Sequence, residues 1–444
     1  MDLIALIPSF GNLLFTLGAF VIAILIIISI HEFGHYIVGR WTGIHAEVFS
    51  LGFGRVLWSR VDKHGTKWQL AAIPFGGYVK FLGDANAASG KDGEAMGAMS
   101  DAERRHTMHG APLWARSLTV AAGPVFNFIL SIIIFACIVS WRGVAMDPLT
   151  IDMVQPSPYA QELQSGDKVL AIGGQEISDL SSLNILLDNL PDVDQVNYDV
   201  LRGGDTLTVT GLHPFPATVA GLTPQSAALK AGVKVGDVIL TVNGEPVPTF
   251  ASLRLLVGQS EGKELALEIW RHGDMVALAF SPVRRDIPLA EGGFETRWMM
   301  GISGDLSFVP TTQSPGFVAA VKSGYNSTSY IISASLSGLY HVATGGISTC
   351  NLSGPVTIAK TSGYAASQGV LTFLSFVAFV STAVGLMNLF PIPVLDGGHL
   401  VFHAYEAITG RPPKDGVLQK LMMVGLVLII GLMVFALTND FVCP

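Results

Sequence analysis

Residues 19–35, AFVIAILIIISIHEFGH, decide the architecture, because an unbroken apolar run leads directly into a cluster of ionisable side chains. The run belongs to an apolar stretch from about Ile7 to Val38, which exceeds the roughly 20 residues that a helix needs to span a bilayer. Ionisable groups inside a span are costly and usually mark function. The sequence therefore predicts a membrane protein with a functional site at the end of its first span.

Three further stretches are long and apolar enough to span a bilayer, at about 117–140, 371–390 and 421–437. The composition agrees, since 50% of the 444 residues are hydrophobic and only 14% are charged, against roughly 25% charged in soluble domains. A net charge of -8 argues against a nucleic-acid partner. The fold class that we predict is a polytopic α-helical membrane protein with four transmembrane helices and a water-soluble part.

Basic residues indicate the orientation of the chain. They are concentrated in the connection between the first two predicted spans and in the connection between the last two. By the positive-inside rule both connections are cytoplasmic, so both termini and the long stretch 141–369 lie outside. Cys350 and Cys443 could pair only if both face an oxidising compartment, and the sequence leaves their pairing open.

The cluster at the end of the first span is a metal-binding pattern. His31 and His35 are four residues apart, so on a helix both imidazoles share a face and can reach one zinc ion. Glu32 is placed to take a proton from a water molecule, which is the logic of the H-E-x-x-H motif. A chance match, or a histidine pair that only packs, is the alternative. The position directly after an apolar run favours the metal site.

A third ligand must come from elsewhere, because catalytic zinc usually has three protein ligands. Residues 388–399, NLFPIPVLDGGH, end the third predicted span with two prolines that stop a regular helix. A broken segment at membrane depth is tolerated only beside protein or a water-filled cavity. Asp396 is the one carboxylate in this segment, while His399 and His403 are rival ligands. The alternative is a span end with an N-capping aspartate.

Residues 49–80 alternate β-prone segments with glycine turns, which predicts a small membrane-associated β-sheet at the cytoplasmic face. A free edge of this sheet could pair with a substrate that has unwound from its helix, and would present the scissile amide to the metal. A hairpin that only seals the site is the alternative.

An internal repeat lies between the second and third predicted spans. Residues 166–177, GDKVLAIGGQEI, align with residues 236–247, GDVILTVNGEPV, at an offset of 70. Two copies indicate two small α/β domains. Both look like PDZ modules, which bind extended peptides by strand addition; size exclusion of bulky substrates is the alternative role. The predicted domains are a first membrane half 1–141, PDZ-like domains 142–214 and 215–286, an outside linker with surface helices 287–370, and a second membrane half 371–444.

Two motifs resemble the signatures of the site-2 protease family of intramembrane zinc metalloproteases. They are H-E-F-G-H at 31–35 and N-x-x-P-x-P-x-L-D-G at 388–397. The similarity extends along nearly the whole chain and includes residues 123–127, GPVFN, in the second span. It implies that His31, His35 and Asp396 bind one Zn²⁺ and that Glu32 is the catalytic base. The residues that it implies for substrate binding are Asn388, Gly52, Phe53, Gly54, Pro391 and Pro393.

The same resemblance implies an endopeptidase of the bacterial inner membrane, with periplasmic termini and PDZ domains. Its expected partner is a single-span transmembrane substrate, such as a trimmed anti-sigma factor or a remnant signal peptide, and cleavage would release a cytoplasmic signal. A non-enzymatic PDZ scaffold with a structural metal is the alternative, although a structural zinc site needs no base such as Glu32. A metal transporter would carry ionisable residues in several spans, and the second and fourth have almost none.

Overall fold

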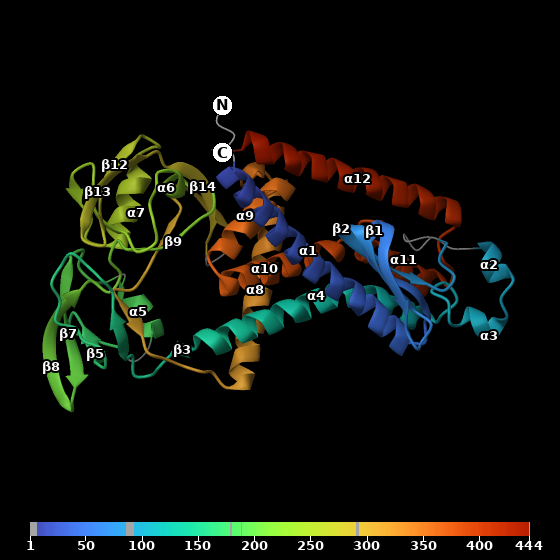
Figure 1. Ribbon diagram of the computed structural model, residues 1–444, viewed down its shortest axis with the longest axis horizontal. Helices are drawn as coiled ribbons and strands as arrows, with labels where there is room; N and C mark the ends of the chain where they lie inside the picture. Colours follow the sequence, from blue (N-terminus) through green and yellow to red (C-terminus); the bar gives the residue numbers. More distant parts are fainter. Residues whose placement is uncertain (1–6, 86–92, 178–179, 188, 290–292, 444) are drawn as a thin grey trace. The chain divides into compact units, whose positions relative to one another are not determined.

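The computed structural model describes residues 7–85, 93–177, 180–187, 189–289 and 293–443. Contacts divide the chain into two compact units, and most of their elements are labelled in Figure 1. We call them the membrane unit, which comprises Met1–Ile138, Val318–Leu339 and Thr349–Cys443, and the sheet unit, which comprises Val139–Phe317 and Tyr340–Ser348.

The membrane unit contains four helices that are long and apolar enough to cross a bilayer. This confirms the four predicted spans. The third helix ends just before Pro391 and Pro393, which cannot continue a regular helix. Of the four helices, the last has the smallest share of residues buried by the rest of the protein, as expected for a helix that faces lipid. The four are α1 (Ile7–Trp41), α4 (Leu113–Arg142), α10 (Val370–Asn388) and α12 (Asp415–Val442).

The first three of these helices share an apolar core. Ala23 and Ile27 of α1 pack with Ile134 of α4 and with Val377 and Ala378 of α10. The other helices of the chain are α2 (Gly93–Gly97), α3 (Asp101–Arg104), α5 (Leu180–Leu187), α6 (Ala227–Lys230), α7 (Phe250–Gln259), α8 (Phe317–Ala343), α9 (Pro355–Ser367) and α11 (Asp396–Thr409), with a 3₁₀ turn at Thr349–Asn351.

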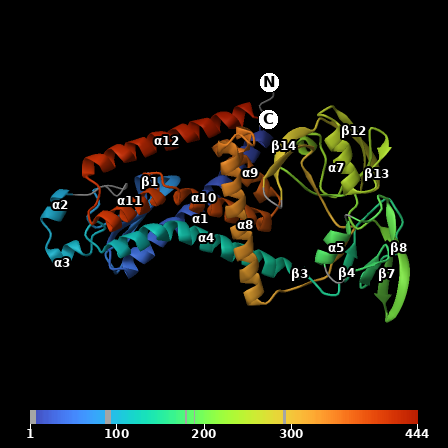
Figure 2. The ribbon, with the colours of Figure 1, turned by 180° about the vertical axis from the view of Figure 1, so that it is seen from behind.

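Helix α8 crosses α4 (Figure 2), and Gly324 lies at the close approach. A Cβ atom at Gly324 would lie 2.3 Å from the carbonyl oxygen of Ile132, so only glycine permits this approach. The sequence predicts a surface helix over this stretch. Phe317, Tyr325 and Tyr330 of α8 are exposed in the isolated chain.

The membrane unit also contains the small sheet, made of β1 (Ala46–Val61) and β2 (Lys67–Phe81). Residues 48–51 pair with residues 77–80 on one side and with residues 67–70 on the other, because both strands bend sharply. Residues 67–71 pair on their other side with residues 56–61. The two edges of the sheet are therefore residues 77–80 and residues 56–61.

The sheet unit contains the repeat that the sequence predicts. Its two four-stranded sheets have the orders β6-β5-β7-β8 and β11-β10-β12-β13, which are the same topology at an offset of about 70 residues. Each copy has its own buried core. The strands are β5 (Lys168–Ile172), β6 (Gln175–Glu176), β7 (Gln195–Arg202), β8 (Asp205–Leu212), β10 (Val238–Val242), β11 (Glu245–Pro246), β12 (Leu265–Arg271) and β13 (Asp274–Phe280).

The Gly-Asp turn of each copy is fixed by the same ion pair. Asp167 Oδ1 lies 2.6 Å from Arg202 Nε in the first copy, and Asp237 Oδ2 lies 2.7 Å from Arg271 Nη2 in the second. Both aspartates are buried, and a buried carboxylate needs such a partner. The repeat in sequence is therefore a repeat in structure down to its buried charges.

In the sheet unit, short strands from the earlier part of the chain pair with short strands from its last part, before α8. The pairs are antiparallel, namely β3 with β18, β4 with β17 and β9 with β16, and a separate hairpin joins β14 to β15. Entry and exit therefore lie side by side. The strands are β3 (Val144–Ala145), β4 (Ile151–Val154), β9 (Val219–Leu222), β14 (Val283–Pro288), β15 (Phe294–Met299), β16 (Ile302–Gly304), β17 (Phe308–Pro310) and β18 (Thr312–Gln313).

A disulfide settles the question of the two cysteines. Cys350 is bonded to Cys443, with their Cα atoms 5.5 Å apart. Beside it, Asp440 of α12 accepts hydrogen bonds of 2.9 Å from the backbone amides of Gly354 and Val356 at the start of α9. A carboxylate at a helix N-terminus satisfies free amides and the helix dipole. The end of α12 is thus attached covalently to the 3₁₀ turn at Thr349–Asn351 and electrostatically to the start of α9.

Candidate metal centre

The two histidines of the motif lie one turn apart on α1 and face the same point. Their Nε2 atoms are 3.2 Å apart, and the ring planes are nearly perpendicular, at 86°. The helix supplies this arrangement by itself, since residues four apart share a face.

Asp396, the first residue of α11, brings a third donor atom to that point. Its Oδ2 atom lies 3.2 Å from His31 Nε2 and 3.6 Å from His35 Nε2. A tetrahedral zinc site with bonds of about 2.0–2.1 Å has ligand atoms about 3.3 Å apart. Oδ2 is also buried and, within the described chain, accepts no hydrogen bond of regular geometry. The donor set therefore fits zinc.

Within the residue ranges that the structure describes, this is the one group of three or more histidine, cysteine or acidic side chains whose donor atoms converge this closely. The atoms of His31, His35 and Asp396 all lie within 4.8 Å of one another. The rival histidines of the sequence prediction are not part of the group.

The loop before Asp396 explains how the carboxylate reaches α1. Helix α10 ends at Asn388 and α11 begins at Asp396, so the predicted helix break is present. A Cβ atom at Gly397 would lie 2.3 Å from the carbonyl oxygen of Leu389, and one at Gly398 would lie 2.3 Å from that of Ile392. Only glycines allow the loop to fold back this tightly onto the first turn of α11.

A backbone carbonyl fixes the orientation of His35. Its Nδ1 atom donates to the Thr119 oxygen of α4 at 2.8 Å, which leaves the lone pair of Nε2 for the centre. Metal-binding histidines generally donate their second ring N–H in this way. Thr119 could not be identified from the sequence, because the contact spans 84 residues.

Glu32 lies between the histidines and the small sheet. Its carboxylate interacts electrostatically with both imidazoles and with Asp396, and it is in hydrogen-bonding position to the Val79 backbone. A Cβ atom at Gly77 would lie 3.0 Å from Glu32 Cγ. The edge of the sheet at residues 77–80 therefore passes directly beside Glu32.

The residues predicted to bind substrate lie on two elements. On β1, Gly52 and Gly54 adopt φ values of 89° and 85°, which bend the strand, and Phe53 between them stacks on Tyr78 with ring centroids 6.0 Å apart. Asn388 is the last residue of α10. Pro391 and Pro393 belong to the loop that follows it. Their role in substrate binding stays a prediction.

His403 faces away from the donor atoms, toward α4. Its Nδ1 atom lies 3.2 Å from Ser117 Oγ. Burial, followed by the nearby Arg116 guanidinium, lowers the pKa of His403 to about 4, so the ring is neutral at physiological pH. Arg116 in turn forms two hydrogen bonds with Glu406, of 2.6 and 3.1 Å. These contacts hold α11, and with it Asp396, against α4.

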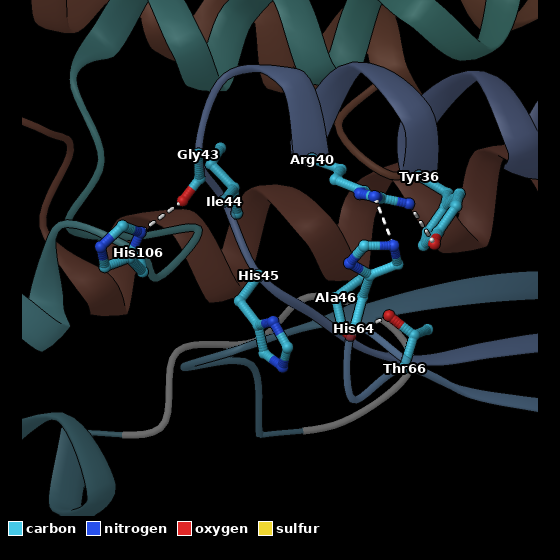
Figure 3. Close-up of a pocket in the computed structure, with 9 residues that line it drawn as sticks. All are labelled: Tyr36, Arg40, Gly43, Ile44, His45, Ala46, His64, Thr66 and His106. Carbon is cyan, nitrogen blue, oxygen red and sulfur yellow. Dashed lines mark hydrogen bonds between the residues drawn. The ribbon is translucent and has the colours of Figure 1, made fainter. Parts of the chain in front are cut away.

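A second histidine-rich region lies at the end of α1 (Figure 3). It is a hollow of about 210 Å³, which we call the α1-end hollow. Polar groups in its lining bind one another, since Arg40 Nη2 lies 2.6 Å from His64 Nε2, and His106 Nδ1 lies 2.7 Å from the Gly43 carbonyl oxygen. The residues that line it are Tyr36, Arg40, Gly43, Ile44, His45, Ala46, His64, Thr66 and His106.

Comparison with known proteins decides the family. The sequence profile of peptidase family M50 matches residues 19–432. The chain belongs to peptidase family M50. A regulator of sigma E protease from Haemophilus influenzae is 31% identical over 461 residues, which cover 97% of this chain and 99% of that protein. A protein of Agrobacterium fabrum that is named a putative zinc metalloprotease is 35% identical over 429 residues, which cover 95% of this chain and 94% of its own length.

A third relative, the regulator of sigma-E protease RseP of Salmonella typhimurium, is 32% identical over 461 residues, covering 97% of this chain and 99% of RseP. This M50 peptidase is thus a zinc-dependent metalloendopeptidase of a bacterial inner membrane that acts on membrane proteins. The predicted family, enzyme class and metal are confirmed, and the hypothesis of a non-enzymatic scaffold is wrong.

Proposed function

We propose that His31, His35 and Asp396 bind one zinc ion, and that Glu32 is the catalytic base for cleavage of single-span transmembrane substrates within the bilayer. The observation that carries the proposal is the convergence of three donor atoms, 3.2–3.6 Å apart, at the end of an apolar helix. Zinc bound there would acidify a water molecule and polarise the scissile carbonyl group.

Glu32 accepts a proton from the attacking water and passes it to the leaving amine. Its position next to His31 and its electrostatic contact with all three ligands support this role. Asn388, at the end of α10, offers an amide that can hydrogen-bond the substrate backbone.

The substrate binds as an extended strand, because a peptide bond inside a helix is not accessible to the attacking water. The edge strand at residues 77–80 is suited to this binding by its place beside Glu32, and strand addition to the edge of a sheet is a common mode of peptide recognition. Gly52 and Gly54, at the bend of β1, and the proline loop after Asn388 form the remainder of the binding surface. The apolar side chains on residues 56–61, among them Leu57 and Trp58, are exposed and suit contact with lipid.

The orientation that we propose places both termini and the sheet unit in the periplasm. The basic connections on the opposite side support it. So does the disulfide between Cys350 and Cys443, since such bonds persist in oxidising compartments. The two repeats of the sheet unit act as PDZ-like domains that bind peptide segments or exclude bulky proteins. The names of the relatives favour an anti-sigma factor as substrate, with remnant signal peptides as a second class.

The test is cleavage of a single-span reporter by the purified protein, beside the Glu32→Gln variant, with zinc measured in both. We expect both proteins to hold one zinc and the variant to cleave about 10²–10⁴-fold more slowly, the usual contribution of a general base. If neither protein cleaves any of several trimmed reporters while both hold zinc, the proposed substrate class is wrong. If the variant cleaves at the native rate, the role of Glu32 is wrong.

A further inference from the structure

Helix α4 forms a third wall of the metal centre through the GPVFN motif. Gly123 and Asn127 are four residues apart, so they share one face of the helix. A Cβ atom at Gly123 would lie 2.3 Å from His35 Nε2 and 2.8 Å from His31 Cε1. The imidazoles therefore occupy the space that any side chain at this position would need.

Asn127 contacts the other histidine. Its side chain is fully buried, and its Nδ2 atom lies 3.2 Å from His31 Nδ1. Its Oδ1 atom is also buried and has no hydrogen-bond partner among the described residues. The backbone oxygen of Asn127 accepts hydrogen bonds from Ser131 and Ser381, of 3.0 and 2.9 Å. These bonds fix the α4 backbone, while the amide remains directed at His31.

This hydrogen bond constrains the position of the His31 ring proton. A neutral imidazole carries one N–H and one acceptor nitrogen. When the amide nitrogen donates to Nδ1, the ring proton lies on Nε2 and points toward Asp396 Oδ2, 3.2 Å away. Binding a metal through Nε2 requires the proton on Nδ1 instead, and a buried N–H needs an acceptor.

A half-turn of the amide supplies that acceptor, because its oxygen and nitrogen occupy equivalent volumes. We propose that Asn127 is the positioning residue for His31: with its amide oxygen toward the ring, it accepts the Nδ1–H bond and leaves Nε2 to bind zinc. The proposal rests on the proposed role of His31 as a zinc ligand. His35 has the corresponding acceptor in the Thr119 carbonyl.

The test is the zinc affinity of the full-length protein, measured by competition with a chelator in detergent. Asn127→Leu keeps the volume and removes the acceptor, so we expect zinc to bind roughly 10–100-fold more weakly, as when a partner of a metal-binding histidine is lost. Asn127→Asp provides a permanent acceptor, so we expect affinity at or above the native value. Ile138→Val is the matched control, because Ile138 is buried on the same helix and packs in the apolar core shared with α1 and α10.

Three results would overturn the proposal. They are native affinity in a folded Asn127→Leu protein, equal losses in the Leu and Asp variants, and an equal loss in the Ile138→Val control. Thermal unfolding without zinc shows whether each variant is folded. If Asn127→Leu does not fold, Asn127→Asp decides alone, since retained affinity supports the proposal and lost affinity contradicts it. Failure of the native protein to bind zinc would refute the proposed metal centre instead, so the two failures are distinguishable.

Discussion

The metal centre and the α1-end hollow are neighbouring regions of the same helix, and both are rich in histidine. In the metal centre, three donor atoms lie within 3.2–3.6 Å of one another, and the carboxylate oxygen among them has no regular hydrogen bond within the described chain. In the hollow, ring nitrogens of His64 and His106 are already bound to Arg40 and to the Gly43 carbonyl. Convergence of donors without other partners, and not the number of histidines, distinguishes a metal site.

Contacts in and beside the hollow hold α1 and the small sheet together. We call these contacts of Asp62 and His64 the joint. Asp62, in the turn between β1 and β2, accepts hydrogen bonds from the Tyr36 hydroxyl at 3.2 Å and from Trp68 Nε1 at 3.0 Å. His64 in the same turn contacts Arg40 at the end of α1. The joint therefore holds the sheet against the helix that carries Glu32, and its effect on catalysis is indirect.

The largest effect is expected for the carboxylate of the metal centre. Asp396→Ala removes one of three donors, so we expect zinc affinity to fall by more than about 100-fold, beyond the range for a residue that only supports a ligand. Chelator competition measures the loss, and reporter cleavage should stop with it. A His64→Ala variant should keep native affinity. Native affinity after Asp396→Ala would show that the metal is held elsewhere.

A smaller loss is expected for Gly123→Ala. The added methyl group would meet His35 Nε2 at 2.3 Å and displace the ring. A displacement of about 1 Å at a catalytic site can lower the rate by about 10²-fold. The reporter assay measures this. Gly431→Ala in α12 is the control, because a Cβ there meets nothing within 4 Å. Equal rates for the two variants would contradict the packing described here.

The contribution of the joint to folding stability should depend on pH. Burial raises the pKa of Asp62, but hydrogen bonds from Trp68, His64 and Thr66 outweigh it and lower the pKa from 3.8 to about 2. A lowered folded-state pKa gives stability that is present above the unfolded-state pKa and is lost as the pH falls from about 4 toward 2. Solvent screening keeps the contribution below about 1 kcal/mol.

Thermal unfolding of native and Asp62→Asn proteins checks this. At pH 7 the variant should be less stable, and the difference should shrink as the pH falls below about 4. A difference that stays constant down to the lowest pH at which the protein folds would show that the Asp62 charge has no part in it.

The smallest effect is expected for the histidine of the joint. His64→Ala removes an exposed contact with Arg40, so the free energy of unfolding should fall by only about 0.5–1 kcal/mol. Zinc content should be unchanged, which makes this variant the direct counterpart of Asp396→Ala. If His64→Ala lost zinc, the hollow would also contribute to metal binding, and the difference drawn between the two regions would be wrong.

The sequence predicted the donor atoms because their placement is largely local. The two histidines follow from helix geometry, and the carboxylate follows from the proline and glycine break that starts a new helix at Asp396. The partners of the histidines could not be predicted, because Thr119 and Asn127 reach them across 84 and 96 residues. A lone amide inside an apolar span was the one available signal for Asn127. The register of the small sheet depends on bends that composition does not reveal.

The disulfide makes the second membrane half a closed covalent ring. Cys350 and Cys443 are 93 residues apart, and the ring includes Asp396 together with α12, whose Gly425 packs against Pro393 in the loop before Asp396. In the proposed orientation the ring crosses the bilayer twice and is fastened on the periplasmic side. A cytoplasmic protease that cut the connection between α11 and α12 would therefore release nothing. The two fragments would stay tethered, and the aspartate would keep its place beside the histidines.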